Sequence, residues 1–257
     1  MTKAAFTVLG SSAGMPQAGR INSGYVLEVD ARLFQLDCGG GVCHMFRRKG
    51  FDPLAVERIV ISHTHPDHIS DLPLFIQMEY LAGRREPLVI HLPHEAVDPV
   101  KSLFRAMYLI REKLPFELSL APVSAGEAIE AEGVKIEPIA NSHLVKYAPF
   151  VREYGLKSRQ ESYSFLIKVG GKSLLYSADL GTEGDILGYL DGLDVLVIES
   201  THIDLGRVLE KAAERGVGRV VLTHLAEDYD VSQALAMGQK AGMANLLIAH
   251  DGLRIEL

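Results

Sequence analysis

The sequence predicts an α/β fold, and three observations lead to that prediction. Short apolar runs rich in β-branched residues alternate with longer runs of helical periodicity. Two stretches of the first half resemble two stretches of the second half in the same order. Histidine or aspartate follows several of the apolar runs, and in α/β proteins binding sites form beyond the carboxyl ends of strands. We therefore expect one domain over residues 1–257, with similar halves at about 1–125 and 126–257.

The expected elements follow from the spacing of apolar residues. Apolar runs predict strands at 4–10, 24–29, 32–37, 57–63, 134–140, 163–169, 172–178, 194–200 and 218–224, and strand character within 246–257. Helical spacing predicts helices at 95–114, 204–216 and 231–242, the second with Asp204 as N-cap and Gly216 at its C-terminal end. Residues 144–162 are expected to form a loop that mixes basic and aromatic side chains.

Two internal likenesses support similar halves. RIVISH (58–63) resembles RVVLTH (219–224), because each has a basic residue, an aliphatic run, a hydroxyl residue and a histidine. YVLEVDARLFQLDCG (25–39) resembles FLIKVGGKSLLYSADLG (165–181), because each is a strand, a short turn and a strand followed by Asp and Gly. Such strings are partly generic, so the likenesses leave a true duplication open.

The composition excludes several classes of protein. Hydrophobic residues make up 47% and charged residues 23% of the chain, as in ordinary globular domains. A net charge of -7 disfavours a general nucleic-acid binder. The cysteines, Cys38 and Cys43, are too few for a disulfide framework, which fits a protein of a reducing compartment. Both are expected to be buried as small hydrophobic side chains. The N-terminus lacks a signal-type apolar run and no stretch reaches the ~18 apolar residues of a membrane helix. We expect a cytoplasmic protein with no membrane partner.

The motif SHTHPDH, residues 62–68, is the strongest functional signal. His63 and His65 are one residue apart and can point the same way in extended backbone, and the turn at Pro66 gives Asp67 and His68 a second direction. Imidazole nitrogens and carboxylate oxygens suit zinc and similar divalent ions. The alternative is a polar loop whose histidines are satisfied by hydrogen bonds. Four such groups directly after an apolar strand favour the metal site.

This motif resembles the signature of the metallo-β-lactamase superfamily. The resemblance spans nearly the whole chain and implies a four-layer αββα sandwich of two similar halves. It also implies that His143 in ANSHLV, Asp179 in LLYSADLG and His224 in VVLTHL are further ligands. By the family pattern, two divalent ions, zinc or alternatively manganese or iron, would be held by two ligand sets: His63, His65, His143 and Asp179 for one, and Asp67, His68, Asp179 and His224 for the other.

Within the superfamily, the chain is most similar to the ribonuclease Z branch. VLGSSAGMPQAGRINSGYVLE, FQLDCGGG and IVISHTHPDHISDLP follow that family's order of strand, Gly-rich loop, Asp-Cys-Gly and metal motif. Only 36 positions separate His143 from Asp179, which leaves no room for the arm that binds tRNA in ribonuclease Z. The segment VIESTHID resembles the family's strand end that carries a glutamate. The family's separate catalytic histidine after that strand has no match here.

The resemblance and the motif predict a dinuclear hydrolase. A hydroxide held between the ions would attack the substrate, because bound metals lower the pKa of water. Asp67 would orient or deprotonate the nucleophile, and His202 or His250 would donate a proton to the leaving group. A phosphodiesterase acting on a small diester, such as a cyclic nucleotide or an oligonucleotide end, agrees best with the missing arm. Members of the family often dimerise, so a homodimer is one expected assembly, and no large nucleic acid is expected as a partner.

Other functions stay open at this point. A ribonuclease Z-type endonuclease for tRNA 3′ ends and a carboxylic ester, thioester or lactone hydrolase would use the same metal site. A di-iron redox enzyme is disfavoured because such family members have glutamate at the position of His65. A metal-binding protein without turnover is the most distant alternative.

Several residues near the motif have two interpretations. Asp37 either supports a ligand histidine or bonds backbone amides in a turn, and the former is favoured. His250 or Asp251 could orient a metal ligand from the last hairpin. The 144–162 segment is either an inert surface loop or a lip with stacking faces and phosphate-binding charges. His44, His91 and His94 are expected to be surface or structural residues.

Overall fold

The computed structural model describes residues 2–257 and divides into two compact units. The N-terminal unit comprises Thr2–Ser124 together with Asp251–Glu256, and the C-terminal unit comprises Ala125–His250. Each unit has a seven-stranded mixed sheet and its own helices. The predicted α/β class is therefore confirmed.

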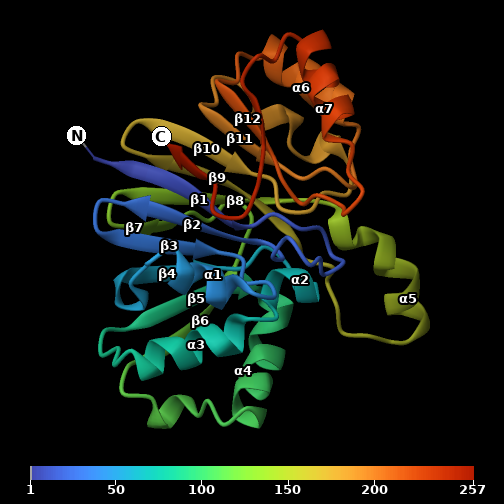
Figure 1. Cartoon of the computed structure of the whole chain (residues 1–257). Helices are drawn as coiled ribbons and strands as arrows, with labels where there is room; N and C mark the ends of the chain where they lie inside the picture. The colour runs from blue at the N-terminus through green and yellow to red at the C-terminus, as the bar shows by residue number, and fades with distance from the viewer. Residues whose placement is uncertain (1) are drawn as a thin grey trace. The chain divides into compact units, whose positions relative to one another are not determined.

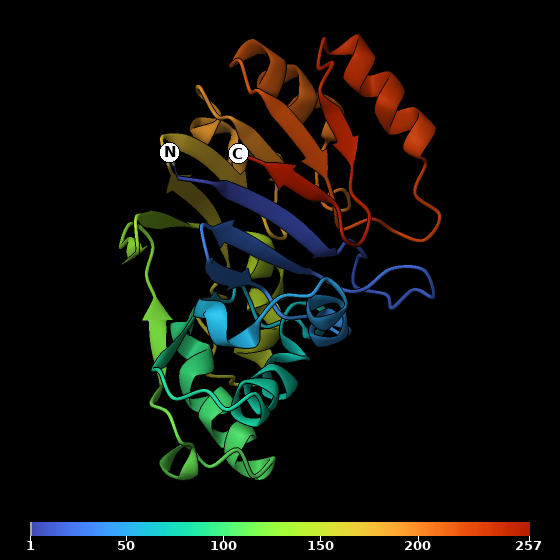
Figure 2. The same cartoon turned by 60° about the vertical axis from the view of Figure 1, so that its left-hand side comes forward.

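The sheet of the N-terminal unit has the order β14-β1-β2-β3-β4-β5-β6. The first four strands pair antiparallel and the last four parallel, so β3 belongs to both sets. Figure 2 shows β14, from the end of the chain, beside β1. The strand bounds are Ala4–Gly10, Gly24–Val29, Arg32–Leu36, Val56–Val60, Leu88–Pro93 and Leu118–Val123 for β1 to β6, and Arg254–Glu256 for β14.

Helices cover this sheet and share its core. They are α1 (Val42–Arg48), α2 (Pro66–Ile69), α3 (Leu72–Leu81) and α4 (Val97–Ala106) (Figure 1). Phe46 of α1 and Phe75 of α3 meet edge to face with ring centroids 5.1 Å apart, and both are fully buried. Burial of such apolar side chains is the main force that holds the helices on the sheet.

The sheet of the C-terminal unit has the order β13-β12-β11-β10-β9-β8-β7. Helices α6 (Leu205–Glu214) and α7 (Val231–Lys240) pack on it through buried Val208, Leu209 and Ala234 (Figure 1). The strand bounds are Ile129–Ala131, Val134–Ala140, Tyr163–Val169, Lys172–Tyr176, Val195–Ile198, Arg219–Leu222 and Leu246–Ile248 for β7 to β13. Asp204 caps α6 by accepting from the Arg207 amide, as predicted.

The two sheets repeat one another in strand order. Counted from the edge, β14-β1-β2-β3-β4 corresponds to β7-β8-β9-β10-β11. The hairpins β2–β3 and β9–β10 turn at equivalent pairs, Val29 with Arg32 and Val169 with Lys172, so the hairpin likeness joins equivalent strands. RIVISH lies on β4 and RVVLTH on β12, whereas β4 corresponds to β11. The likeness of 58–63 to 219–224 therefore does not join equivalent strands.

Three predicted elements differ most from the structure. The helix predicted over 95–114 ends at Ala106, because Tyr108 adopts the left-handed conformation with φ 61°. The segment 144–162 is not a plain loop, since it holds a 3₁₀ helix at His143–Tyr147 and α5 at Ala148–Glu153. The strand predicted to end on His63 ends at Val60. None of the helices described in residues 2–257 has the length and apolar character needed to cross a membrane.

Candidate metal centre

The metal motif follows β4 and places its four side chains as two pairs. A one-turn helix, α2, starts at Pro66 and carries Asp67 and His68. The ring of His68 still packs against that of His63, with centroids 4.2 Å apart. Nε2 of His63 lies 3.0 Å from Nδ1 of His65. Nε2 of His68 lies 3.4 Å from a carboxylate oxygen of Asp67. The N-terminal unit thus presents two distinct pairs of ligand atoms.

Asp37, at the end of β3, holds this motif in place. Its fully buried carboxylate accepts hydrogen bonds from the Ser62 amide (2.7 Å), the Ser62 hydroxyl (2.8 Å) and Nδ1 of His68 (2.8 Å). A carboxylate on one imidazole nitrogen fixes the tautomer and directs the other nitrogen outward as a ligand. Asp37 therefore contacts a histidine of the motif, and its support of a metal ligand stays a prediction.

The glycines after Asp37 provide the clearance that this packing needs. A Cβ on Gly39 would lie 1.9 Å from the carbonyl oxygen of Asp67, so only glycine allows this approach. The Cys38 amide also bonds the His68 carbonyl at 2.7 Å. Both cysteines are buried and free, as predicted.

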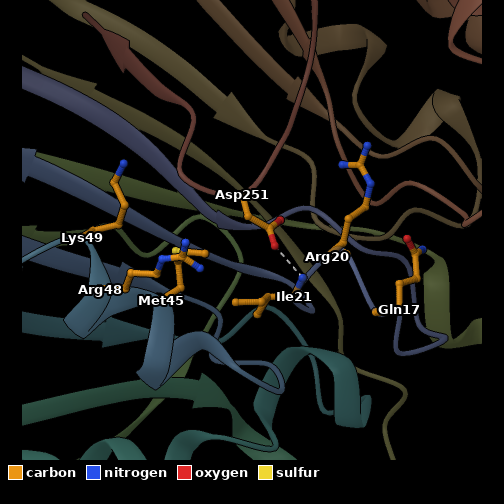
Figure 3. Close-up of a pocket in the computed structure, with 9 residues that line it drawn as sticks. Gln17, Arg20, Ile21, Met45, Arg48, Lys49 and Asp251 are labelled. Carbon is orange, nitrogen blue, oxygen red and sulfur yellow. Dashed lines mark hydrogen bonds between the residues drawn. The ribbon is translucent and has the colours of Figure 1, made fainter.

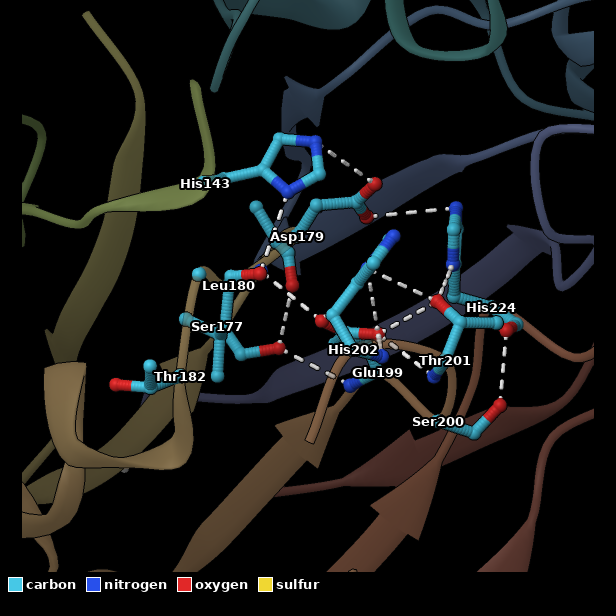
Figure 4. Close-up of polar contacts among 12 residues, drawn as sticks. His143, Ser177, Asp179, Leu180, Thr182, Glu199, Ser200, Thr201, His202 and His224 are labelled. Atoms are coloured by element: carbon cyan, nitrogen blue, oxygen red, sulfur yellow. Dashed lines mark hydrogen bonds and ion pairs between the residues drawn. The ribbon is translucent and has the colours of Figure 1, made fainter. Parts of the chain in front are cut away.

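In the C-terminal unit, one carboxylate serves two histidines (Figure 4). One oxygen of Asp179 lies 3.6 Å from Nε2 of His143, and its other oxygen lies 3.4 Å from Nε2 of His224. Nδ1 of His143 faces the Leu180 carbonyl at 3.2 Å, and Nδ1 of His224 faces the Thr201 hydroxyl at 3.1 Å. All three side chains are nearly fully buried. Both histidines therefore turn the same nitrogen, Nε2, toward the shared carboxylate.

The backbone next to these ligands is strained. Ala178 has φ 48° and His224 has φ 55°, a conformation that costs residues other than glycine of order 1 kcal/mol or more. Strain of this kind persists where the surroundings fix the chain, and it is found preferentially at functional sites.

Glu199 and His202 form a pair that the sequence did not predict (Figure 4). Nδ1 of His202 lies 3.0 Å from one oxygen of the buried Glu199 carboxylate. Glu199 also accepts from the amides of Leu180, Thr201 and His202. Burial raises the pKa of Glu199, but the hydrogen bonds from His202 and Leu180 outweigh it and hold the pKa below its ordinary value. The hydrogen bond to Glu199 in turn raises the pKa of His202.

The imidazole of His202 lies among the other polar groups of the C-terminal unit. Its ring centroid is 4.8 Å from that of His143 and 6.1 Å from that of His224. Because Glu199 occupies Nδ1, His202 keeps Nε2 for another partner. A strand end with glutamate followed three residues later by histidine is the signal that could have revealed this pair.

Equivalent strand ends carry the same hydrogen bond with the partners exchanged. In the N-terminal unit the Ser62 amide donates to Asp37, the acid on the hairpin strand. In the C-terminal unit the Glu199 amide donates to the hydroxyl of Ser177, so that the acid is on the next strand. The Asp37 carboxylate also holds Nδ1 of His68, which follows β4. The Glu199 carboxylate likewise holds Nδ1 of His202, which follows β11.

The distances within each unit agree with metal ligation. Ligand atoms around a tetrahedral zinc with bonds of about 2.1 Å stand about 3.4 Å apart. The four pairs described above are separated by 3.0, 3.4, 3.6 and 3.4 Å. Imidazole and carboxylate donors also suit zinc and its neighbours. The residues present are therefore suited to holding divalent metal ions.

The turn between β13 and β14 is not a hairpin, because the two strands belong to different sheets. Asp251 accepts from the Ser11 amide, the Ser11 hydroxyl and the Ile21 amide, so it holds the β1–β2 loop. His250 is exposed at the turn after β13. A catalytic role for His250 stays a prediction.

Comparison with known proteins agrees with this geometry. The family model described as "Beta-lactamase superfamily domain" matches residues 34–225. Ribonuclease Z of Methanothermobacter thermautotrophicus is 25% identical over 297 aligned positions, covering 98% of this chain and 96% of the relative. That alignment is longer than the chain, so the relative carries segments that are absent here.

Solved structures resemble the whole chain. The metallo-β-lactamase fold protein YhfI of Bacillus subtilis superposes with a TM-score of 0.78 at 20% identity, covering 100% of both chains. A diphosphatase from the PhnP family superposes with a TM-score of 0.70 at 20% identity, covering 99% of this chain and 98% of the other. At 20% identity, these two similarities show that the fold is shared. The matched family model, together with the histidine and aspartate pairs, shows that the chain belongs to the β-lactamase superfamily as a metal-dependent hydrolase with the metallo-β-lactamase fold.

Proposed function

We propose that the chain is a dinuclear phosphodiesterase. The single observation that supports a dinuclear site best is Asp179, whose two oxygens face different histidines. One ion would take the pairs His63/His65 and His143/Asp179, and the other would take Asp67/His68 and His224/Asp179. Zinc is the first choice, because nitrogen-rich, partly carboxylate donor sets suit it.

The residues around the ligands have separable roles in the proposed reaction. Two bound divalent ions would polarise the diester and lower the pKa of water. Asp67 is less buried than His68 and would accept the proton of the attacking water. His202 would donate a proton from Nε2 to the leaving oxygen, and Glu199 would position its ring through Nδ1.

Aromatic side chains beside His143 support a nucleotide-like substrate. Tyr147 on the 3₁₀ helix, Phe150 on α5 and Tyr154 directly after α5 follow His143, and they are 40%, 53% and 67% exposed. The ammonium of Lys146 lies 5.4 Å from the centroid of the Tyr147 ring. Exposed rings can stack on bases, and nearby cations attract phosphate. A neutral carboxylic ester or lactone would not use the nearby cation.

A ribonuclease Z-type endonuclease is the second candidate, since the relative named Ribonuclease Z aligns over nearly its full length. The segments absent from this chain argue for shorter substrates than tRNA. Hydrolysis of a precursor tRNA and of a dinucleotide, measured side by side, would distinguish the two. A preference for the precursor would favour the second candidate.

The first test compares three substrate classes on metal-counted protein. Bis(p-nitrophenyl) phosphate, p-nitrophenyl acetate and a lactone are assayed with the native chain and with Asp179→Ala. Exposed His94, on the helical turn after β5, provides a His94→Ala control. We expect diester turnover that Asp179→Ala abolishes and His94→Ala leaves intact. Turnover of the ester or lactone alone would refute the phosphodiesterase proposal.

The role of His202 is tested by changing the leaving group. The p-nitrophenolate expelled from a p-nitrophenyl ester of a nucleotide leaves without protonation. The alkoxide expelled from a dinucleotide needs a proton. General acids contribute ~10²–10⁴-fold to rates. We expect His202→Ala to lower kcat on the dinucleotide by ~100-fold or more and to lower kcat on the p-nitrophenyl ester by less than ~5-fold. Equal losses on both substrates would exclude His202 as the proton donor.

A further inference from the structure

A basic pocket lies on the N-terminal unit, outside the metal-ligand pairs (Figure 3). It has a volume of about 520 Å³ and is formed by the β1–β2 loop, the C-terminal end of α1 and the Asp251 turn. Its charged lining residues are Arg20, Arg48, Lys49 and Asp251, so cations outnumber anions three to one. The chain as a whole carries a net charge of -7, so the pocket is positively charged on an acidic protein.

The positive charges of Arg48 and Lys49 are not neutralised by the carboxylate of the pocket lining. The Asp251 carboxylate is occupied by the Ser11 amide and hydroxyl and by the Ile21 amide. Lys49 donates to the carbonyl of Gly252, an uncharged acceptor, at 3.1 Å. Among residues 2–257, neither Arg48 nor Lys49 has a carboxylate within ion-pair distance. Two exposed cations without anionic partners, facing one cavity, are suited to binding an anion.

The same segments connect this pocket to the metal motif. The β1–β2 loop that lines the pocket also passes Asp67, since a Cβ on Gly14 would lie 3.6 Å from the Asp67 carboxylate. Gly39, packed on the Asp67 carbonyl, precedes α1, which carries Arg48 at its far end. Seven helical residues span about 10 Å. The pocket is therefore placed for a group of the substrate other than the one that reacts.

We propose that the basic pocket binds a second phosphate group of the substrate. This inference rests on the proposed phosphodiesterase function and narrows its substrate class. The substrate would be a diester that carries another phosphate, such as an oligonucleotide with a terminal phosphate, and not an isolated cyclic diester. Arg48 would bind the phosphate oxygens with its planar guanidinium, and Lys49 would add a point charge.

The kinetic test compares substrates that differ by one phosphate. Bis(p-nitrophenyl) phosphate and UpU lack a second phosphate, whereas pUpU and UpUp carry one. The variants are Arg48→Ala and Arg48→Glu. The matched control is Arg47→Ala, because Arg47 is exposed on the same helix, does not line the pocket and donates from its side chain to the Phe51 carbonyl.

The expected result is selective. At least one phosphorylated dinucleotide should be hydrolysed with a higher kcat/KM than UpU. Arg48→Ala should lower that kcat/KM by about 5-fold and Arg48→Glu by more, and the loss should shrink in 1 M salt because exposed charges are screened. Rates on bis(p-nitrophenyl) phosphate and UpU should not change, and Arg47→Ala should behave as the native chain does. Equal losses on all substrates, or no loss with Arg48→Glu, would overturn the inference.

A binding measurement separates this inference from the proposed function. Inorganic pyrophosphate is titrated calorimetrically into the metal-free protein and its Arg48→Glu and Arg47→Ala variants. Weaker binding by Arg48→Glu alone supports the pocket, even if no diester is hydrolysed. Equal binding by all three proteins overturns it. Failure of the native chain to hydrolyse any diester contradicts the proposed function instead.

Discussion

Replacing Asp37 with asparagine should weaken metal binding without any change to a ligand. One oxygen of Asp37 accepts from the Ser62 amide, and the other accepts from both the Ser62 hydroxyl and Nδ1 of His68. An asparagine that keeps its oxygen on the Ser62 amide turns its NH₂ group toward His68. His68 would then have to move its proton to Nε2, the nitrogen needed for a metal.

The size of the effect follows from this geometry. Loss of a partner that orients a ligand lowers metal affinity by ~10–100-fold, which is ~1.4–2.8 kcal/mol. If the amide flips instead, its NH₂ meets the Ser62 N–H, and a buried donor without an acceptor costs ~1–3 kcal/mol of folding stability. Asp37→Asn therefore loses either metal affinity or stability.

Two assays distinguish these outcomes. Competition with a chromophoric chelator gives the metal affinity, and urea unfolding of the metal-free protein gives the stability. Asp71→Asn is the control, because the Asp71 carboxylate accepts from the Gly41 and Cys43 amides at the start of α1, and its replacement should lower stability alone. Metal affinity within about 2-fold of the native value, with unchanged stability, would refute the reasoning.

Three further predictions concern the scaffold. Burial lowers the pKa of His91 to about 4, so the neutral ring contributes stability above pH 6.5 that is lost as the pH falls toward 4. Urea unfolding of the metal-free native protein should show a free energy of unfolding that is ~2 kcal/mol lower at pH 5 than at pH 7.5. The His91→Leu variant should not show this loss. Gly39→Ala should cost ~1–3 kcal/mol through its clash with the metal-motif carbonyl, while Gly188→Ala, with open space around its Cβ, should unfold at nearly the native urea concentration. Arg84→Leu removes the buried partner of Glu79, and burial raises the pKa of Glu79 to about 7. The substitution should lower the free energy of unfolding by ~3–5 kcal/mol at pH 8 and by less at pH 5, where the Glu79 carboxyl is protonated. An equal loss at both pH values would contradict this reasoning.

The two pairs of the SHTHPDH motif could be predicted because their signals are local. In SHTHPDH the side chains are ordered by three short-range facts: the strand end, the one-residue spacing of two histidines and the turn at Pro66. His143 and Asp179 required the family resemblance, because 36 positions separate them and only the sheet brings them to 3.6 Å. Location in the cytoplasm and assembly as a homodimer stay predictions.

The pair of Glu199 and His202 was not predicted, because the contact between the two side chains depends on how β11 ends. The glutamate turns inward only because three backbone amides and the Thr201 hydroxyl converge on it. That convergence is a property of the folded loop, and no periodicity in the sequence reports it.

The end of α4 was missed because its stop signal is unusual. Tyr108 adopts the left-handed conformation, the Leu109 amide bonds the Phe104 carbonyl, and the Tyr108 amide bonds the Arg105 carbonyl. This is the hydrogen-bond pattern that glycine usually supplies at a helix C-terminus. Because tyrosine occupies this position in place of glycine, the helical spacing of apolar residues predicted a helix that continues beyond its true end.

The exchanged acid and hydroxyl at the strand ends constrain how this chain can vary. At each strand end, a backbone amide of one strand bonds a side-chain oxygen of its neighbour, either a carboxylate oxygen of Asp37 or the hydroxyl of Ser177. In the N-terminal unit, the single Asp37 carboxylate makes this bond and also holds the imidazole of His68. In the C-terminal unit, Ser177 makes the bond and Glu199 holds the imidazole of His202. A substitution of Asp37 therefore removes both contacts at once, whereas a substitution of Ser177 or of Glu199 removes one of them.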